Sequence, residues 1–239
     1  MEWKIIHIDE TDSTNRLLKD KAWEAEENIV VWADFQTSGR GCGTNRWESE
    51  RGKNLLFSIL LHPTEVAATK QFRISMAVSL AICEALGQYI GDLSIKWPND
   101  IYWRNGKICG ILIENTLKGN TIKDSIIGVG LNVNQRTFHS DAPNPVSLWQ
   151  IAGQETDREQ LLNGILEALD KYMAPANLPH LGEDYRKMLY RRTGFHPYAD
   201  KDGAFMAEMV GVEDDGHLVL RNEEGQERRY AFKEVQFIM

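Results

Sequence analysis

Positive charge is what the sequence most clearly lacks. Its 239 residues include 27 lysines and arginines against 35 aspartates and glutamates, which gives a net charge of −8 with histidine neutral. A chain with this balance has no overall positive field that would attract a polyanion. We therefore expect no nucleic-acid partner.

Cysteine pairs and long apolar runs are also missing. Cys42, Cys83 and Cys109 are odd in number and form no CxxC pair, as is usual in a reducing compartment. The first residues, MEWKIIHIDE, lack the basic start and apolar run of a signal peptide, and no later stretch approaches about 18 consecutive apolar residues. We expect a cytoplasmic protein without a membrane partner. The six histidines show no metal-ligand spacing, so we predict no metal-ligating residue.

The patterns that are present predict a folded α+β protein. Strand-like runs rich in β-branched and aromatic residues occupy 3–8, 29–35, 54–61, 93–97, 107–113 and 122–133. Helical patterns lie between them: Ser13 or Thr14 can cap a helix that continues to about Glu24, an apolar stripe runs from Val78 to Tyr89, and a third helix begins at Asp157. We expect helices to cover one large mixed β-sheet.

A second, smaller unit follows the sequence YRRTG. Short strand-like runs at 204–212, 217–221, 227–232 and 235–238 are separated by the turn sequences EDDG and NEEG. They predict a small antiparallel β-barrel that leans on the larger domain, with the boundary between 1–190 and 191–239.

The glycine-rich sequence GRGCG is a candidate anion site. Gly39, Gly41 and Gly43 allow close backbone approach, and Arg40 offers a bidentate donor, so the stretch can form a phosphate cradle. It is not a Walker loop, and Thr44 stands where a dinucleotide-binding loop needs its third glycine. A flexible strand connector is the other interpretation.

The sequence KWPNDIYWRNGKICG is a second candidate. Asn105-Gly106 predicts a hairpin that places Lys107 at the mouth of an apolar strand, and Pro98 interrupts the strand before it. Two lysines, an asparagine and an aspartate then gather near the hairpin, as either a nucleotide site or a solvated turn with a surface ion pair. Gly110 indicates that something presses against the strand at that point.

Two further stretches could contact a ligand. In GVGLNVN, Gly128 and Gly130 leave one strand face bare, either as a floor for a flat ligand or for close packing on a helix, and Asn132 ends the strand with an amide. In DSTN, residues 12–15, the side chains cap a helix or bind a polar ligand. The segment QRTFHSDAPNPVSLWQ, residues 135–150, suits a mobile binding loop.

In this order, the motifs DSTN, QTSGRG, KWPNDIYW with GKICGILIE, and GVGLNVN resemble the biotin protein ligase family. Members of that family use ATP to attach biotin to a lysine of a biotin carboxyl carrier protein domain, through biotinyl-5'-AMP. The resemblance implies a class II synthetase-like catalytic domain with a C-terminal SH3-like barrel. Because Trp3 already belongs to the first strand, it implies the short form without DNA-binding helices.

The resemblance also implies a role for each motif residue. The residues that would hold the ring end of biotin are Ser13, Thr14, Asn15 and Gln36. Gly39, Arg40 and Gly41 would close over biotin and the adenylate phosphate, with Gly110 beneath the ligand and Trp47 ordering the loop near adenine. The residues on the nucleotide side, with Mg²⁺, would be Lys96, Asn99, Asp100 and Asn132.

The chemistry explains these residue types. A carboxylate must attack the α-phosphorus of ATP, so cations are needed between the two anions, and Arg40 and Lys107 suit this role. The mixed anhydride is sensitive to water, which makes a closing loop useful. The acceptor amine must then lose a proton, and Asp100 is the candidate that orients it or takes the proton.

The chain departs from the family pattern in the loop. Cys42 stands where members usually carry Arg or Gln, and Gly43-Thr44 replaces an Arg-Gly pair, so one loop cation is missing. We hypothesise that the loop grips the adenylate less firmly. A lipoate or octanoate ligase or transferase, and a non-catalytic biotin or nucleotide sensor, are the alternative functions, and a homodimer stays open.

Overall fold

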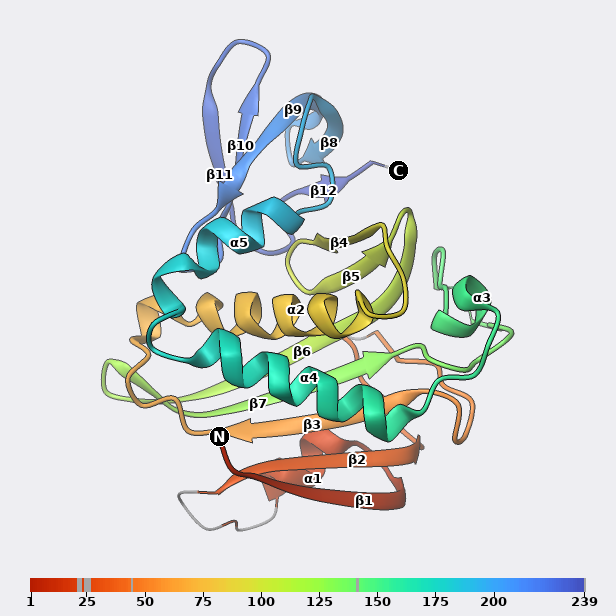
Figure 1. Ribbon diagram of the computed structural model, residues 1–239. Coiled ribbons are helices and arrows are strands. Elements are labelled where there is room, and N and C mark those ends of the chain that lie inside the picture. Colours follow the sequence, from red (N-terminus) through yellow and green to blue (C-terminus); the bar gives the residue numbers. More distant parts are fainter. Residues whose placement is uncertain (21–22, 24–26, 44, 141, 239) are drawn as a thin grey trace.

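The computed structural model describes residues 1–239 except 21–22, 24–26, 44, 141 and 239. A seven-stranded sheet in the order β1-β2-β3-β7-β6-β5-β4 forms its centre (Figure 1). Its strands are β1 (Trp3–Thr11), β2 (Asn28–Gln36), β3 (Leu55–Leu61), β4 (Leu93–Lys96), β5 (Asp100–Trp103), β6 (Gly106–Lys118) and β7 (Thr121–Leu131). β1 and β2 are parallel and the other pairs antiparallel, so the sheet is mixed, as predicted.

The two faces of the sheet are covered differently. Helices α2 (Phe72–Leu86) and α4 (Arg158–Met173) lie across one face, with α5 (Leu181–Met188) beside them (Figure 1). Ile127, Val129 and Leu131 of β7 point into the core on this side because alternate side chains of a strand face opposite ways. On the other face, α1 (Thr14–Asp20) packs Leu18 against Ile126 in a second, smaller apolar cluster.

The predicted helices and strands are present, with some changes at their ends. The first helix is described to Asp20, and Glu24 lies outside the described residues. The hairpin after β5 turns one residue earlier than predicted, because Gly106 pairs with Trp103 and leaves Arg104 and Asn105 as the loop. A Cβ on Gly106 would lie 2.8 Å from Val146 Cγ1, so this glycine allows a close approach of another segment.

The C-terminal β domain (residues 196–238) is a five-stranded antiparallel sheet in the order β11-β10-β9-β8-β12. Its strands are β8 (His196–Asp200), β9 (Gly203–Val212), β10 (Leu218–Asn222), β11 (Glu227–Tyr230) and β12 (Gln236–Phe237). The sequence did not predict β8, since its Pro197 weakens a strand signal only five residues long. Tyr198 of this strand is nevertheless fully buried.

The C-terminal β domain is fastened to the larger part of the chain. Trp97 Nε1 donates a hydrogen bond to the Gly216 carbonyl at 3.0 Å, and the Arg73 guanidinium forms a bidentate ion pair with Asp214. A single core cluster continues from the central sheet into this domain. In Figure 1 the domain lies next to β4 and α5, which brings it to the edge of the site described below.

Within the described residues, we find no helix that combines the length and the apolar character needed to cross a membrane.

Candidate active site

Glycines from two neighbouring strands form a bare patch on the sheet face opposite α2. Gly110 of β6 pairs directly with Gly130 of β7, and Leu112 pairs with Gly128. Because these three glycines share one face, the sheet there presents backbone instead of side chains. A cavity of about 1130 Å³ lies over this glycine floor. The predicted site residues all line it except Gly39.

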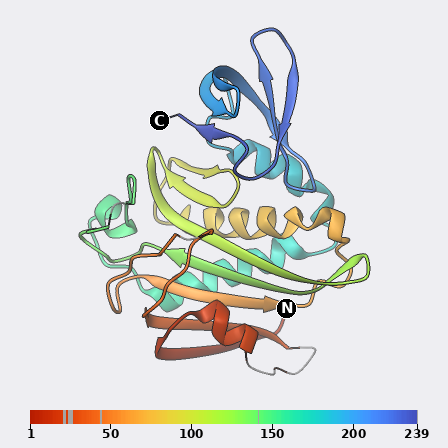
Figure 2. The same cartoon turned by 180° about the vertical axis from the view of Figure 1, so that it is seen from behind.

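The connection between β2 and β3 forms the roof. Figure 2 shows it crossing the back of the sheet over β6 and β7. Its arms are joined by hydrogen bonds from Trp47 N to Gly39 O (3.1 Å) and from Gly41 N to Asn45 O (2.8 Å). A Cβ on Gly39 would lie 2.9 Å from the Trp47 carbonyl, so Gly39 serves this close pairing and not the lining of the cavity. Thr44, at the tip, lies outside the described residues.

The Trp47 indole lies directly on the glycine floor. A Cβ added to Gly130 would be 2.5 Å from Trp47 Cε2, and one added to Gly110 would be 3.0 Å from Cζ3. The prediction that something presses against Gly110 is therefore confirmed, and the group that does so is this ring. Trp47 Nε1 is buried and has no hydrogen-bond partner in the described part of the chain.

The end of the cavity next to α1 is a buried polar network. Gln36 Oε1 accepts from the Thr14 amide at 2.8 Å, and Ser58 Oγ lies 2.6 Å from both Thr14 Oγ1 and Asn15 Oδ1. Since an amide oxygen can only accept, Ser58 donates to Asn15 and accepts from Thr14. Ser58, which is fully buried, thus joins Thr14 to Asn15, and Gln36 is attached to the network through Thr14.

Ser58 and Glu114 take part in this network from behind the cavity wall, and the sequence did not single them out. Asn15 Nδ2 donates to Glu114 Oε2 at 3.1 Å, while a Cβ on Gly128 would collide with Asn15 Oδ1 at 2.2 Å. The lone serine in the apolar strand LLFSILL was a usable signal, because an unpaired hydroxyl is costly in a core. Glu114 offered none, since acidic residues are common near strand ends.

The opposite wall carries the predicted charges. Lys107 Nζ forms an ion pair with Asp100 Oδ1 at 2.6 Å, with side chains 30% and 22% exposed. Both side chains line the cavity, so this ion pair lies in the cavity wall. Arg40 also lines the cavity but makes no ion pair among the described residues.

Lys96 stands further toward β4. Its Nζ lies 3.2 Å from the Tyr102 hydroxyl and 5.4 Å from the centroid of the Phe237 ring in the C-terminal β domain. Burial lowers the pKa of Lys96, and the Asp100 carboxylate acts in the opposite direction. Burial also raises the pKa of Tyr102 to about 12, so its hydroxyl keeps its proton.

Asn99 and Asn132 line the cavity with their amide N–H groups turned to the backbone. Asn99 Nδ2 donates to Ile111 O at 2.6 Å, and Asn132 Nδ2 donates to Val146 O at 3.1 Å. Asn132 Oδ1 is buried and has no partner within the described ranges. The two side-chain amides are therefore fixed in the cavity wall, and the Asn132 oxygen is left without a hydrogen-bond donor.

The predicted binding loop 135–150 closes one side. Glu48 Oε1 accepts from the His139 amide and Glu48 Oε2 from the Ser140 amide, both at 2.8 Å. Burial raises the pKa of Glu48, but these hydrogen bonds outweigh it and lower the pKa. The end of the predicted loop is wrong, since residues 148–150 belong to α3 (Leu148–Ala152), which Ser147 caps.

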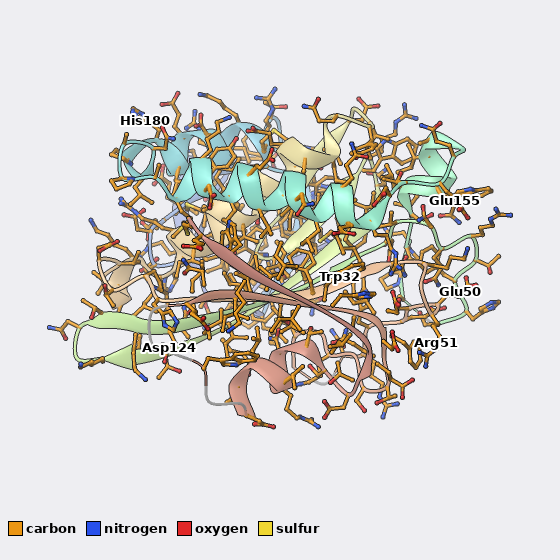
Figure 3. All side chains as sticks on the ribbon, turned by 60° about the horizontal axis from the view of Figure 1, so that its bottom comes forward. Trp32, Glu50, Arg51, Asp124, Glu155 and His180 are labelled. Atoms are coloured by element: carbon orange, nitrogen blue, oxygen red, sulfur yellow. The ribbon has the colours of Figure 1, made fainter. Side chains whose placement is uncertain are left out.

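The ends of these loops gather on one side of the molecule. Figure 3 shows Glu50 and Arg51, which follow Glu48, at the same end as Glu155, with Asp124 at the opposite end. Lys53 Nζ lies 3.4 Å from Glu155 Oε1. The chain thus brings the roof and the loop 135–150 together at one end of the sheet.

The C-terminal β domain also lines the cavity. It contributes Phe232, Lys233, Val235, Gln236 and Phe237. The turn between β11 and β12 carries no motif, so no local signal could have identified these residues.

The cysteines show no nucleophilic chemistry. Cys42 lines the cavity, and Asn99 Nδ2 lies 3.6 Å from its sulfur. Burial raises the pKa of the Cys42 thiol and the nearby Asp100 raises it further, so the thiol stays protonated. Cys83 and Cys109 are buried core residues.

One group of side chains outside the cavity brings three potential ligand atoms together. Ligand atoms of Glu213, Asp215 and His217 lie within 4.8 Å of one another. Arg229 pairs with both carboxylates and offsets part of their negative charge.

Known proteins match this chain over the same motifs. The model of the biotin/lipoate A/B protein ligase family matches residues 8–132. The bifunctional ligase/repressor BirA of Bacillus subtilis is 30% identical over 240 residues, which cover 95% of this chain and 72% of that protein. The biotin–(acetyl-CoA-carboxylase) ligase of Paracoccus denitrificans is 31% identical over 238 residues, which cover 91% and 94%.

A solved structure agrees in fold. The biotin protein ligase from Aquifex aeolicus in complex with biotin and ATP has a TM-score of 0.77 and 27% identity, over 98% of this chain and 99% of that one. The residues matched by the family model contain the motifs that build the glycine floor and the charged wall. This chain belongs to the biotin/lipoate A/B protein ligase family, as one of its biotin protein ligases.

Proposed function

We propose that this protein uses ATP to ligate biotin to a lysine of a biotin carboxyl carrier protein, through biotinyl-5'-AMP. The observation that carries the proposal is one cavity with a neutral, hydrogen-bonding end at α1 and a cationic wall at β5 and β6. A flat uncharged ring bearing an aliphatic carboxylate suits the first end, and a nucleotide triphosphate suits the second.

An unpaired donor supports the placement of the ring. Trp47 Nε1 is buried and has no hydrogen-bond acceptor in the described part of the protein. A buried N–H without a partner costs roughly 1–3 kcal/mol, and an acceptor on the ligand removes that cost. The ureido oxygen of biotin is such an acceptor.

The cations support the first step. A carboxylate oxygen of biotin bonds to the α-phosphorus, the bond from phosphorus to the bridging oxygen breaks, and pyrophosphate leaves with the electron pair. Arg40 and Lys107 line the space between the two anions and stabilise the developing charge.

We also propose that Mg²⁺ accompanies ATP. Asn132, whose buried Oδ1 has no partner among the described residues, and Asp100 both line the cavity, and oxygen donors are the ligands that Mg²⁺ prefers. When bound, the ion would neutralise part of the triphosphate charge.

The second step needs a base for the carrier lysine. Its neutral amine attacks the acyl carbon, the amide bond forms and AMP leaves. Among the described residues that line the cavity, the carboxylates are Glu48 and Asp100. Since Glu48 is held by two backbone amides, Asp100 is the group that orients the amine or takes its proton.

For the cellular setting, we infer a cytoplasmic enzyme that acts on a carrier domain and not on nucleic acid. The net charge of −8 supports this. Whether the enzyme works as a monomer or a homodimer is a question for sedimentation.

Pyrophosphate exchange tests the function without the carrier. Labelled pyrophosphate is exchanged into ATP in the presence of biotin, lipoate or octanoate. We expect exchange with biotin alone. Exchange with lipoate or octanoate alone would favour the transferase alternative, and exchange with none of the three would favour the sensor.

A further inference from the structure

Lys233 lies in an unusual backbone conformation at the mouth of the cavity. It occupies the turn between β11 and β12 with φ at 72°, a region that disfavours residues with a Cβ. The Glu234 amide donates to Ala231 O at 3.1 Å, and the Ala231 amide donates back to Glu234 Oε2 at 2.8 Å. The turn is therefore held in the shape that directs Lys233 into the cavity wall.

The ammonium of Lys233 reaches the roof loop from the other domain. A Cβ on Gly43 would lie 3.1 Å from Lys233 Nζ, and the positive charge acts on the neighbouring Cys42 thiol. Within the described residues, Lys233 makes no ion pair, and its Nζ lies 5.6 Å from the centroid of the Phe232 ring. The Lys233 ammonium, which has no counter-ion among the described residues, thus lies beside Cys42 and Gly43, two residues that carry no positive charge.

The order of the strands in the central sheet indicates which part of a ligand lies near Lys233. The ring-end residues Ser58 and Gly128 belong to β3 and β7, the Lys107–Asp100 pair to β6 and β5, and Lys96 to β4. Along this line, the C-terminal β domain adjoins the β4 end, furthest from the ring. The anionic part of the reactants at that end is the phosphate chain of the nucleotide.

We propose that Lys233 binds the phosphate chain of the nucleotide, and so supplies from the C-terminal β domain the cation that the loop at Cys42 lacks. The inference rests on the proposed adenylation reaction. Closure of the roof over ATP then requires the C-terminal β domain to be docked, because the two surfaces share one anion.

The test is a Lys233→Gly variant, with Lys233→Arg as the conservative control. Glycine removes the charge and also suits the positive φ, so the variant should fold at least as stably as the parent. We expect the KM for ATP and for pyrophosphate in biotin-dependent exchange to rise about tenfold, as for a lost charge-assisted hydrogen bond, with the KM for biotin unchanged. Lys233→Arg should retain the parent values.

The two readouts distinguish which phosphate group of the nucleotide Lys233 binds. A higher KM for pyrophosphate places Lys233 on the β- and γ-phosphates, whereas faster release of adenylate onto bystander lysines, with an unchanged KM for pyrophosphate, places it on the α-phosphate. No change in either readout would overturn the proposal.

A double variant tests the exchange of cations. In the Lys233→Gly background, Cys42→Arg should restore the KM for ATP, whereas in the parent it should bring no gain because two cations then compete for one anion. If Cys42→Arg does not restore the KM for ATP in that background, the idea that Lys233 replaces a loop cation is refuted. Calorimetric titration of each variant with inorganic pyrophosphate measures the site even if the parent fails to exchange with biotin, so failure of this proposal and failure of the function are distinct results.

Discussion

The two ends of the cavity are built on different principles. Next to α1, Thr14, Asn15 and Ser58 are at most 4% exposed and bond to one another. Toward β4, Arg40 and Lys233 are exposed, come from a loop and a turn, and pair with no acidic group in the part of the chain that the structure describes.

The difference follows from the two tasks. A neutral ring is recognised by groups whose orientation is set before binding, and a saturated buried network sets it. A phosphate chain is recognised mainly by charge, and unpaired cations from separate segments can surround it. Substitutions should therefore act on biotin at one end and on ATP at the other.

The largest effect is expected from Lys107→Ala. Removing this cation from between the two reacting anions should lower the rate of biotin-dependent pyrophosphate exchange by about 10²–10³. Lys118→Ala, at the exposed far end of the same strand, is the control and should retain the parent rate. A Lys107→Ala enzyme with full activity would remove the charged wall from the proposed mechanism.

The second-largest effect is expected from Gly130→Ala. The new Cβ would stand 2.5 Å from the Trp47 ring, so the roof must shift or the strand must distort, at a cost of about 1–3 kcal/mol in unfolding free energy. We expect exchange to fall by roughly 10²-fold, as for misplaced catalytic groups. Gly182→Ala meets no atom within 4 Å and is the matched control, and equal melting temperatures and rates for the two variants would contradict the contact.

Ser58→Ala sharpens the contrast between the ends. It leaves the buried Asn15 Oδ1 without its donor, which should cost about 1–3 kcal/mol and raise the KM for biotin roughly tenfold, with the KM for ATP unchanged. Ser125→Ala removes another fully buried serine, whose Oγ has no partner in the described chain, and should be neutral. An equal rise in both KM values would show that the ends are not independent.

The smallest effect concerns Glu48 and pH. Hydrogen bonds hold the pKa of its carboxyl below the ordinary value of 4.5, so the clamp on residues 139 and 140 is fully formed above that pH. It is lost as the pH falls through the folded-state pKa. Amide hydrogen exchange at His139 and Ser140, corrected for intrinsic rates, should therefore accelerate below about pH 4.5 in the parent.

Glu48→Gln is the control for this pH dependence. Its side chain does not titrate, so the corrected exchange rates should be nearly constant between pH 3 and 6, about the range in which carboxyl groups change charge. The same acceleration in Glu48→Gln would show that another group controls the loop.

Much of the catalytic domain followed from local pattern. Alternation and β-branched residues identified the strands, and residue type identified the cations at Arg40, Lys96 and Lys107. The missed β8 shows the limit of this reasoning, because Tyr198 is buried by partners on β9 and β12 and not by any periodicity of its own. The early turn at Arg104 likewise depended on Val146, which packs on Gly106 from a distant segment.

By itself, the sequence determined the residue chemistry: bare glycines on one strand face, cations near a hairpin, and hydroxyl and amide groups at a helix start. Residue types and short sequence spacings define these features, so they can be identified without a structure. The tertiary structure decided which of them meet. Only it could bring Trp47 onto Gly130, Ser58 beneath Thr14, and Lys233 to Gly43, because these contacts join residues far apart in the chain, and long-range contacts are set by packing of the whole fold and not by local propensity.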